Sequence, residues 1–431
     1  MRQTIKAKAL NTIRNNRKVF NNAFFLTIIQ TVNYLLPLIT VPYLVRVLGT
    51  ERFGFIAFAG SLMAYFQIII DYGFNLSATR EVSLHKKDTP WLSNHFFSVL
   101  AVKSTLALIC LAVLGIIVFG IPRFHNESLF YFLLFIGLVG NILFPVWFFQ
   151  GMEEMGYITF FNLIARLITT VLYFVLIKTP NDYLWMAWLG VIASWSTGVA
   201  SIIFALKRYS IRFFVPGLAS YKACLAGGFR IFITQISVSL FTNTNTFLLG
   251  LFTNNVVVGH YAIGEKIVRA VVFLSAPIGG AIYPRVSVLF GESKERALGF
   301  LRKILIAGIG FFGLMSGVLF VGADLFVWLV SGHQSKETAF LIRIMSILPL
   351  SIFVDNIYGT QIMLNINLKN KFMWIILLGG LFSVTLQIIM VPLIKATGTS
   401  IAFSVSEVSM ALFMIWAVRK EGIFLFSKPA I

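Results

Sequence analysis

Several charged residues lie within otherwise apolar stretches of this chain, and the type of each side chain determines which ligands it can bind. Arginine offers paired hydrogen bonds that match phosphate oxygens, and lysine offers a point charge. The candidates for contact with an anionic ligand are Arg46, Lys103, Arg166, Lys266, Arg269 and Arg343. Carboxylates in such surroundings can take up a proton or a cation from an ion gradient. The candidates for this role are Asp71, Asp355 and Glu407.

Each of these charges has a second interpretation, which is pairing inside the protein. An ionised group at the centre of a membrane helix costs roughly 2.5 to 3.5 kcal/mol on insertion scales, so these groups must face water, a ligand or one another. Glu265 and Arg269 are four residues apart and could satisfy each other on one helix face. Arg343 could extend to the membrane surface. The carboxylates could simply balance the cations, and the sequence leaves both roles open.

Uncharged polar residues form two stripes at helical spacing, and such stripes are typical of a cavity wall or of hydrogen bonds between helices. The longer stripe follows offsets of 0, 4, 7, 8 and 11 and comprises Gln235, Ser239, Thr242, Asn243 and Thr246. The shorter one comprises Gln30, Asn33 and Thr40. We expect the longer stripe to line a cavity, with Gln235 and Asn243 as ligand contacts.

The elements that must position these residues are membrane helices. Hydrophobic residues make up 58% of the 431 and charged residues only 12%, which no soluble globular chain of this size approaches. A helix needs roughly 20 apolar residues to cross the hydrocarbon core. The sequence predicts an all-α integral membrane protein with twelve transmembrane helices, the first two joined by a turn at residues 49–52. The spans are expected near 22–46, 54–78, 95–120, 128–149, 157–178, 183–206, 230–252, 259–289, 303–330, 338–363, 372–394 and 399–418.

The distribution of lysine and arginine predicts the orientation of these spans. Twenty-three of them flank the spans on the side that would carry both termini, and six lie on the other side. Because positive charge is enriched in cytoplasmic segments, both termini are predicted to be cytoplasmic. The net charge of +19 then reflects these flanks, which would contact anionic membrane lipids. Nucleic acid is not an expected partner.

The chain divides into two halves around its longest loop. We predict an N-terminal six-helix lobe over residues 1–206, a cytoplasmic linker over 207–229 and a C-terminal six-helix lobe over 230–431. Identities at a fixed offset of 205 residues indicate parallel repeats, with the cleft between them as the expected ligand site. The matching pairs are Gln30 with Gln235, Leu44 with Leu249, Gly54 with Gly259, and Ala57 with Ala262.

The sequence contains no GxxxxGK[ST] loop for nucleotide hydrolysis and no HExxH or CxxC for zinc binding, and no GxGxxG follows a strand as a dinucleotide-binding fingerprint requires. The predicted outward loops are roughly ten residues or fewer, too short to hold a catalytic domain. We therefore expect a transporter without a cofactor or metal rather than an enzyme.

Two blocks, 37–80 (PLITVPYLVRVLGTERFGF and onward) and 232–287 (FITQISVSLFTNTNTFLLG and onward), with a weaker one at 341–372, resemble bacterial polysaccharide flippases of the Wzx O-antigen type. The resemblance implies the fold of the multidrug/oligosaccharidyl-lipid/polysaccharide exporter superfamily, two six-helix lobes around a central cavity. It also implies movement of an undecaprenyl-pyrophosphate-linked oligosaccharide from the cytoplasmic to the periplasmic leaflet of the bacterial inner membrane.

The resemblance further implies alternating access, in which we expect Arg166 and Lys103 to hold the pyrophosphate. A polysaccharide polymerase and a chain-length regulator are the protein partners it implies. The alternative is a cation-coupled multidrug exporter of the same superfamily. Such exporters are expected to carry an acidic residue in the first helix, where this chain has Gln30 and Asn33.

Overall fold

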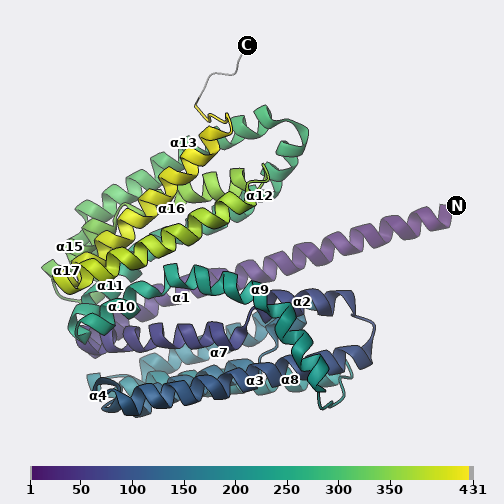
Figure 1. The fold of residues 1–431 in the computed structure, drawn as a ribbon, viewed down its shortest axis with the longest axis horizontal. Helices are drawn as coiled ribbons and strands as arrows, with labels where there is room; N and C mark the ends of the chain where they lie inside the picture. The colour runs from purple at the N-terminus through teal and green to yellow at the C-terminus, as the bar shows by residue number, and fades with distance from the viewer. Residues whose placement is uncertain (1, 427–431) are drawn as a thin grey trace. The chain divides into compact units, whose positions relative to one another are not determined.

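The computed structural model describes residues 2–426, apart from the side chains of 2–24, 26–29, 34, 237–238 and 240–242. Every regular element in that part of the chain is a helix (Figure 1). The helices are α1 (Arg2–Asp71), α2 (Phe74–Leu84), α3 (Thr89–Gly120), α4 (Pro122–His125), α5 (Ser128–Ile142), α6 (Val146–Gly151), α7 (Met155–Leu176), η1 (Pro180–Tyr183), α8 (Leu184–Arg208), α9 (Leu218–Thr242), α10 (Thr244–Phe252), α11 (Asn255–Val272), α12 (Ser275–Glu292), α13 (Lys294–Val321), α14 (Ala323–Ser331), α15 (Lys336–Met345), α16 (Leu348–Asp355), η2 (Asn356–Met363) and α17 (Lys369–Lys420).

The helices make this a multi-pass membrane protein. Among the described residues, nine segments are long and apolar enough to cross a bilayer. Two of them contain a break: α1 leaves helical geometry at Gly49 (φ 77°), and α17 does so at Ile394 and Lys395. An unbroken helix of the 52 residues of α17 would be about 78 Å long, against a hydrocarbon core of about 30 Å. Each of these two segments therefore holds two helices, and Gly49 is the first residue of the predicted turn.

Several spans expected as single helices are interrupted, which corrects the sequence prediction. The span expected at 128–149 is α5 followed by α6, because Pro145 lacks an N–H for the helix ladder and begins a new helix. The span expected at 303–330 ends as α13 at Val321, and α14 begins after Gly322. The span at 259–289 is likewise divided between α11 and α12.

By packing, the described chain forms two compact units. The first comprises residues 2–40 and 62–236, and the second comprises 41–61 and 237–426. The turn of the first hairpin thus packs with the second unit. The predicted division into lobes at 206 and 230 stays a prediction.

Helices of the first unit approach closely where glycines meet. A Cβ on Gly198 of α8 would lie 2.5 Å from the carbonyl oxygen of Gly140 in α5, and a Cβ on Gly140 would lie 2.6 Å from Ser194 Oγ. Small residues allow this approach in membranes, where packing rather than water exclusion drives helix association. The α5–α8 contact, with α7 against α8, frames the cavity described below.

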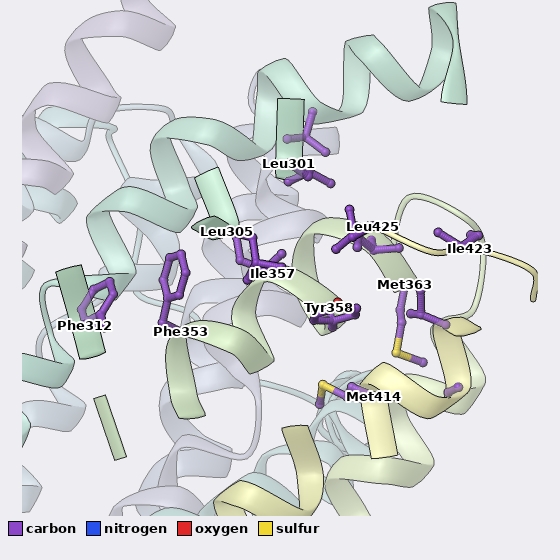
Figure 2. Packing of buried hydrophobic residues seen from close by; sticks show 14 residues of the cluster. Leu301, Leu305, Phe312, Phe353, Ile357, Tyr358, Met363, Met414, Ile423 and Leu425 are labelled. Atoms are coloured by element: carbon purple, nitrogen blue, oxygen red, sulfur yellow. The ribbon is translucent and has the colours of Figure 1, made fainter. Parts of the chain in front are cut away.

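The second unit has an apolar core between α12, α13, α16, η2 and α17 (Figure 2). Phe312 of α13 stacks on Phe353 of α16 with ring centroids 4.8 Å apart. Leu305, Ile357 and Met414 extend this core along the same helices. The core fixes α16 and α17, which carry Asp355 and Glu407.

In the second unit the backbone near Gly54 contacts the backbone near Gly259, and these two glycines occupy equivalent positions in the 205-residue repeat. A Cβ on Gly54 of α1 would lie 1.9 Å from the carbonyl oxygen of Asn255, and a Cβ on Gly259 of α11 would lie 2.1 Å from that of Thr50. Thr50 and Asn255 are themselves 205 residues apart, as Gly54 and Gly259 are. Glycine is required at both positions because the facing backbone occupies the space of a side chain.

Candidate substrate cavity

A cavity of about 400 Å³ lies inside the first unit, between α1, α5, α7 and α8. Its wall is apolar along part of α5, where Leu133, Leu134 and Leu138 contribute. The rest combines further apolar residues of α1, α7 and α8 with hydroxyl, amide and guanidinium groups, which belong to Thr40, Asn141, Asn162, Arg166, Thr169, Thr170, Tyr173, Ser194 and Thr197. A mixed wall of this kind is typical of a binding site for a ligand with several polar groups.

Helix α7 supplies the polar stripe of this cavity. Asn162, Arg166, Thr169, Thr170 and Tyr173 follow offsets of 0, 4, 7, 8 and 11, so they share one face of the helix. Of these five residues, only Arg166 was predicted from the sequence as a ligand contact. The spacing is the same as that of the Gln235 stripe, so a systematic search for it would have found this face.

Arg166 is the charged group of the cavity. Its side chain is exposed, and it forms no ion pair: no carboxylate of the described residues lies within 4.0 Å of its guanidinium. Asn162 donates its amide to the Ile158 carbonyl at 3.0 Å, and Thr197 donates its hydroxyl to the Ala193 carbonyl at 2.7 Å. Their side-chain oxygens keep lone pairs for donors on a ligand. The arrangement can therefore hold an anionic group next to hydroxyl groups.

Lys103 differs from Arg166, because it is buried and paired. Its Nζ lies 2.8 Å from Asp71 Oδ1, with side-chain exposures of 3% and 21%. Gln67 donates to the other oxygen of Asp71 at 2.6 Å. Lys103 is not among the residues that line the cavity. Breaking one side of such a pair leaves an uncompensated buried charge, so the pair favours charge balance for both residues.

Arg46 is held at the end of a helix. Its Nη2 donates to the Leu329 carbonyl at 2.5 Å and its Nε to the Val330 carbonyl at 3.3 Å. Both carbonyls belong to the last turn of α14, where helical carbonyls lack partners and a cation is favoured by the helix dipole. These contacts favour a structural function for Arg46 over contact with a ligand.

Two other predicted cations of the second unit are also paired. Arg269 Nε lies 2.8 Å from Glu265 Oε1, the four-residue pair expected from the sequence. Arg343 Nη2 lies 2.5 Å from Asp324 Oδ2. Lys266 is exposed and forms no ion pair with the described residues.

The polar stripes divide between the two units. Gln235 is partly exposed and packs with the first unit, whereas Asn243 packs with the second and donates to Ser239 Oγ at 3.0 Å. The Thr242 side chain lies outside the described residues. Of the shorter stripe, Thr40 lines the cavity and Gln30 and Asn33 do not.

The two remaining carboxylates lie together in the second unit. Asp355 ends α16 just before the wider turns of η2, and Glu407 of α17 is 5% exposed. The two carboxyl groups are within hydrogen-bonding reach of each other, and Glu407 also faces the charge of Arg269. Asp355 Oδ1 is buried, and within the described part of the chain no donor forms a hydrogen bond to it. This is a buried cluster of titratable groups, separate in sequence and unit from Asp71.

The family model for polysaccharide biosynthesis proteins matches residues 19–290. The chain belongs to this family. Two curated relatives carry the name "Putative O-antigen transporter": the Escherichia coli K12 protein is 29% identical over 411 residues, covering 95% of this chain and 99% of the relative, and the Shigella dysenteriae protein is 28% identical over 400 residues. This is a family of transporters, not of enzymes.

Solved structures show the fold of this family member. An inward-facing multidrug resistance MATE family transporter of the MOP superfamily superimposes with a TM-score of 0.72 at 13% identity, covering 91% of this chain and 94% of that one. The lipid II flippase MurJ in an inward closed conformation superimposes with a TM-score of 0.69 at 13% identity, covering 91% and 87%. The chain therefore has the fold of these two transporters, and the family match above confirms the resemblance to polysaccharide-biosynthesis proteins noted in the sequence.

Proposed function

We propose that this protein moves an undecaprenyl-pyrophosphate-linked oligosaccharide, such as an O-antigen repeat unit, from the cytoplasmic to the periplasmic leaflet of the inner membrane. The observation that carries the proposal is Arg166, which no described carboxylate pairs with, in a cavity whose wall also carries hydroxyl and amide groups. Pyrophosphate matches the guanidinium, and sugar hydroxyls match the Ser, Thr and Asn side chains. The names of the two curated relatives agree with such a substrate.

The transport mechanism in this proposal is alternating access between two six-helix lobes, with both termini cytoplasmic. The likeness to the MATE and MurJ folds supports it, as do the breaks in α1 and α17, each of which separates two helices. Lys103 and Asp71 balance each other in this mechanism, and Arg46, Arg269 and Arg343 stabilise the helices they contact. Gln235, Asn243 and Lys266 stay candidates for substrate contact from the second half, and a polymerase and a chain-length regulator stay candidate partners.

The lipid-linked intermediates of a deletion strain test this function. In the strain without the gene, the oligosaccharide-pyrophosphate-undecaprenol intermediate should accumulate on the cytoplasmic face of the inner membrane, and restoring the gene should clear it. An unchanged distribution of the intermediate between the two faces, together with raised sensitivity to cationic drugs, would instead identify a multidrug exporter.

We further propose that Asp355 and Glu407 couple transport to protons. Replacing either with its amide, Asp355→Asn or Glu407→Gln, removes the titrating group while it keeps the side-chain shape. Each variant should therefore lose the pH dependence of transport measured in proteoliposomes, at wild-type expression. The control is Glu292→Gln, an exposed carboxylate at the end of α12 in the same unit, which should keep the pH dependence. A wild-type pH profile in both amide variants would reject the assignment.

A further inference from the structure

A second cavity, of about 450 Å³, lies in the first unit between α2, α3 and α9. It shares no lining residue with the Arg166 cavity. Polar groups enter it from all three helices, among them Arg80 and Glu81 of α2, Asn94 of α3 and Ser220 of α9. The transport function proposed above does not use it.

One wall of this cavity contains Trp91 and His95, whose rings stack on each other. The rings of His85 and Trp91 are 3.9 Å apart and nearly parallel, and those of Trp91 and His95 are 4.7 Å apart. Asp88 fixes the start of α3 by accepting from the Trp91 backbone N–H at 3.0 Å. The His95 Nε2 atom is buried and has no hydrogen-bond partner among the residues that the structure describes.

Helix α9 closes the opposite side through small residues. Asn94 donates to Ser220 Oγ at 3.1 Å, and His95 Nδ1 lies 3.8 Å from Cys224 Sγ. Burial and the nearby Glu81 carboxylate raise the pKa of the Cys224 thiol to about 11, so the thiol is neutral at pH 7. The side formed by α9 adds no charge to the cavity.

The two charges of the cavity come from consecutive residues and are both unpaired. Arg80 is exposed and Glu81 is half-buried, and neither forms an ion pair with any described residue. Neighbours in a helix point about 100° apart, so the two side chains do not face each other. A ligand with one positive and one negative group would satisfy both, whereas a simple anion or cation would leave one charge without a partner.

We propose that this cavity binds a phosphoethanolamine group, with its phosphate at Arg80 and its ammonium at Glu81. Arg80 can give a phosphate two parallel hydrogen bonds. Leu76 lines the same cavity and is 61% exposed, so an acyl chain attached to the group has apolar surface to follow. The phosphoethanolamine group occurs both as the headgroup of a zwitterionic phospholipid and as a soluble compound, and Arg80 and Glu81 would contact either in the same way.

Native mass spectrometry of the purified full-length protein tests the site. The protein is offered phosphatidylethanolamine and phosphatidylglycerol with identical acyl chains, and the wild type should retain the former several-fold more. Arg80→Gln should lower retention of both lipids about tenfold, because the phosphate of either lipid loses the two charge-assisted hydrogen bonds that the guanidinium offers. Glu81→Gln should lower only the retention of phosphatidylethanolamine, so that the two lipids are retained equally. Lys207→Gln, exposed at the end of α8 and outside the cavity, is the control and should leave the wild-type ratio.

Equal retention of the two lipids by the wild type, or a wild-type ratio in both variants, would overturn the proposal. Phosphatidylcholine, whose ammonium has no N–H to donate, should be retained less than phosphatidylethanolamine, and equal retention would contradict the role of Glu81 without any variant. Displacement of the lipid by soluble phosphoethanolamine at similar concentration would identify the soluble compound as sufficient. Its failure to displace would assign the site to the phospholipid.

Discussion

Replacing Arg166 with glutamine should abolish surface polysaccharide while the protein still inserts and accumulates normally. The guanidinium is the one charge in the wall of the first cavity, and no described carboxylate pairs with it, so its loss leaves no buried partner unsatisfied. Charge-assisted hydrogen bonds contribute roughly 1.5 to 3 kcal/mol, which corresponds to about a ten- to hundredfold loss of affinity for the pyrophosphate. Surface polysaccharide in the complemented deletion strain, with the protein level measured in the same membranes, reports the result.

Two further variants separate substrate binding from packing. Arg166→Lys keeps the charge but loses the planar pair of donors, and it should restore part of the polysaccharide. Arg208→Gln, at the exposed end of α8, should leave the polysaccharide at the wild-type level. Normal polysaccharide in Arg166→Gln at normal protein level would remove Arg166 from the substrate site.

Gly54→Ala and Gly259→Ala should each lower the thermal stability of the purified protein. An added Cβ would meet backbone oxygen at 1.9 Å and 2.1 Å respectively, and backbone in a packed helix pair has little freedom to move. Overpacking of this kind costs about 1 to 3 kcal/mol, which should appear as a lower melting temperature and as less monodisperse protein in detergent. The two variants should lose similar amounts, because their surroundings are equivalent.

Gly60→Ala is the matched control, because it lies on the same helix with open space around its Cβ position. It should be neutral or slightly stabilising, since alanine is the better helix former. A melting temperature for Gly54→Ala equal to that of Gly60→Ala would show that the α1–α11 contact accommodates the added methyl group without loss of stability.

The class of the protein and its helical fold were predictable from the sequence, because apolar runs near 20 residues leave few alternatives in a bilayer. The turn at Gly49 was predictable for the same reason. The interruptions before Pro145 and at Gly322 were missed, because the residues on both sides of each break are apolar. Hydropathy therefore stays high across the break and does not reveal it. Length and composition therefore predicted the existence of the spans better than their continuity.

The site was predictable only in part, because the group that pairs with a buried charge is determined by the three-dimensional fold. Lys103 and Arg166 appear alike in the sequence, as single cations near the middle of apolar segments. The structure brings Asp71, 32 residues away, to Lys103, whereas it brings no described carboxylate to Arg166. Only the pair of Glu265 and Arg269 was expected in advance, because a four-residue spacing fixes neighbours on one helix.

The contact at Gly54 and Gly259 has the form of an isologous interface. Thr50 faces Gly259 as Asn255 faces Gly54, so each segment meets its own counterpart, as subunits do in a homodimer with a twofold axis. One polypeptide thus contains a crossing that is ordinarily made between two. In such a crossing neither glycine can be replaced on its own, because a side chain at one position would collide with the backbone next to the other.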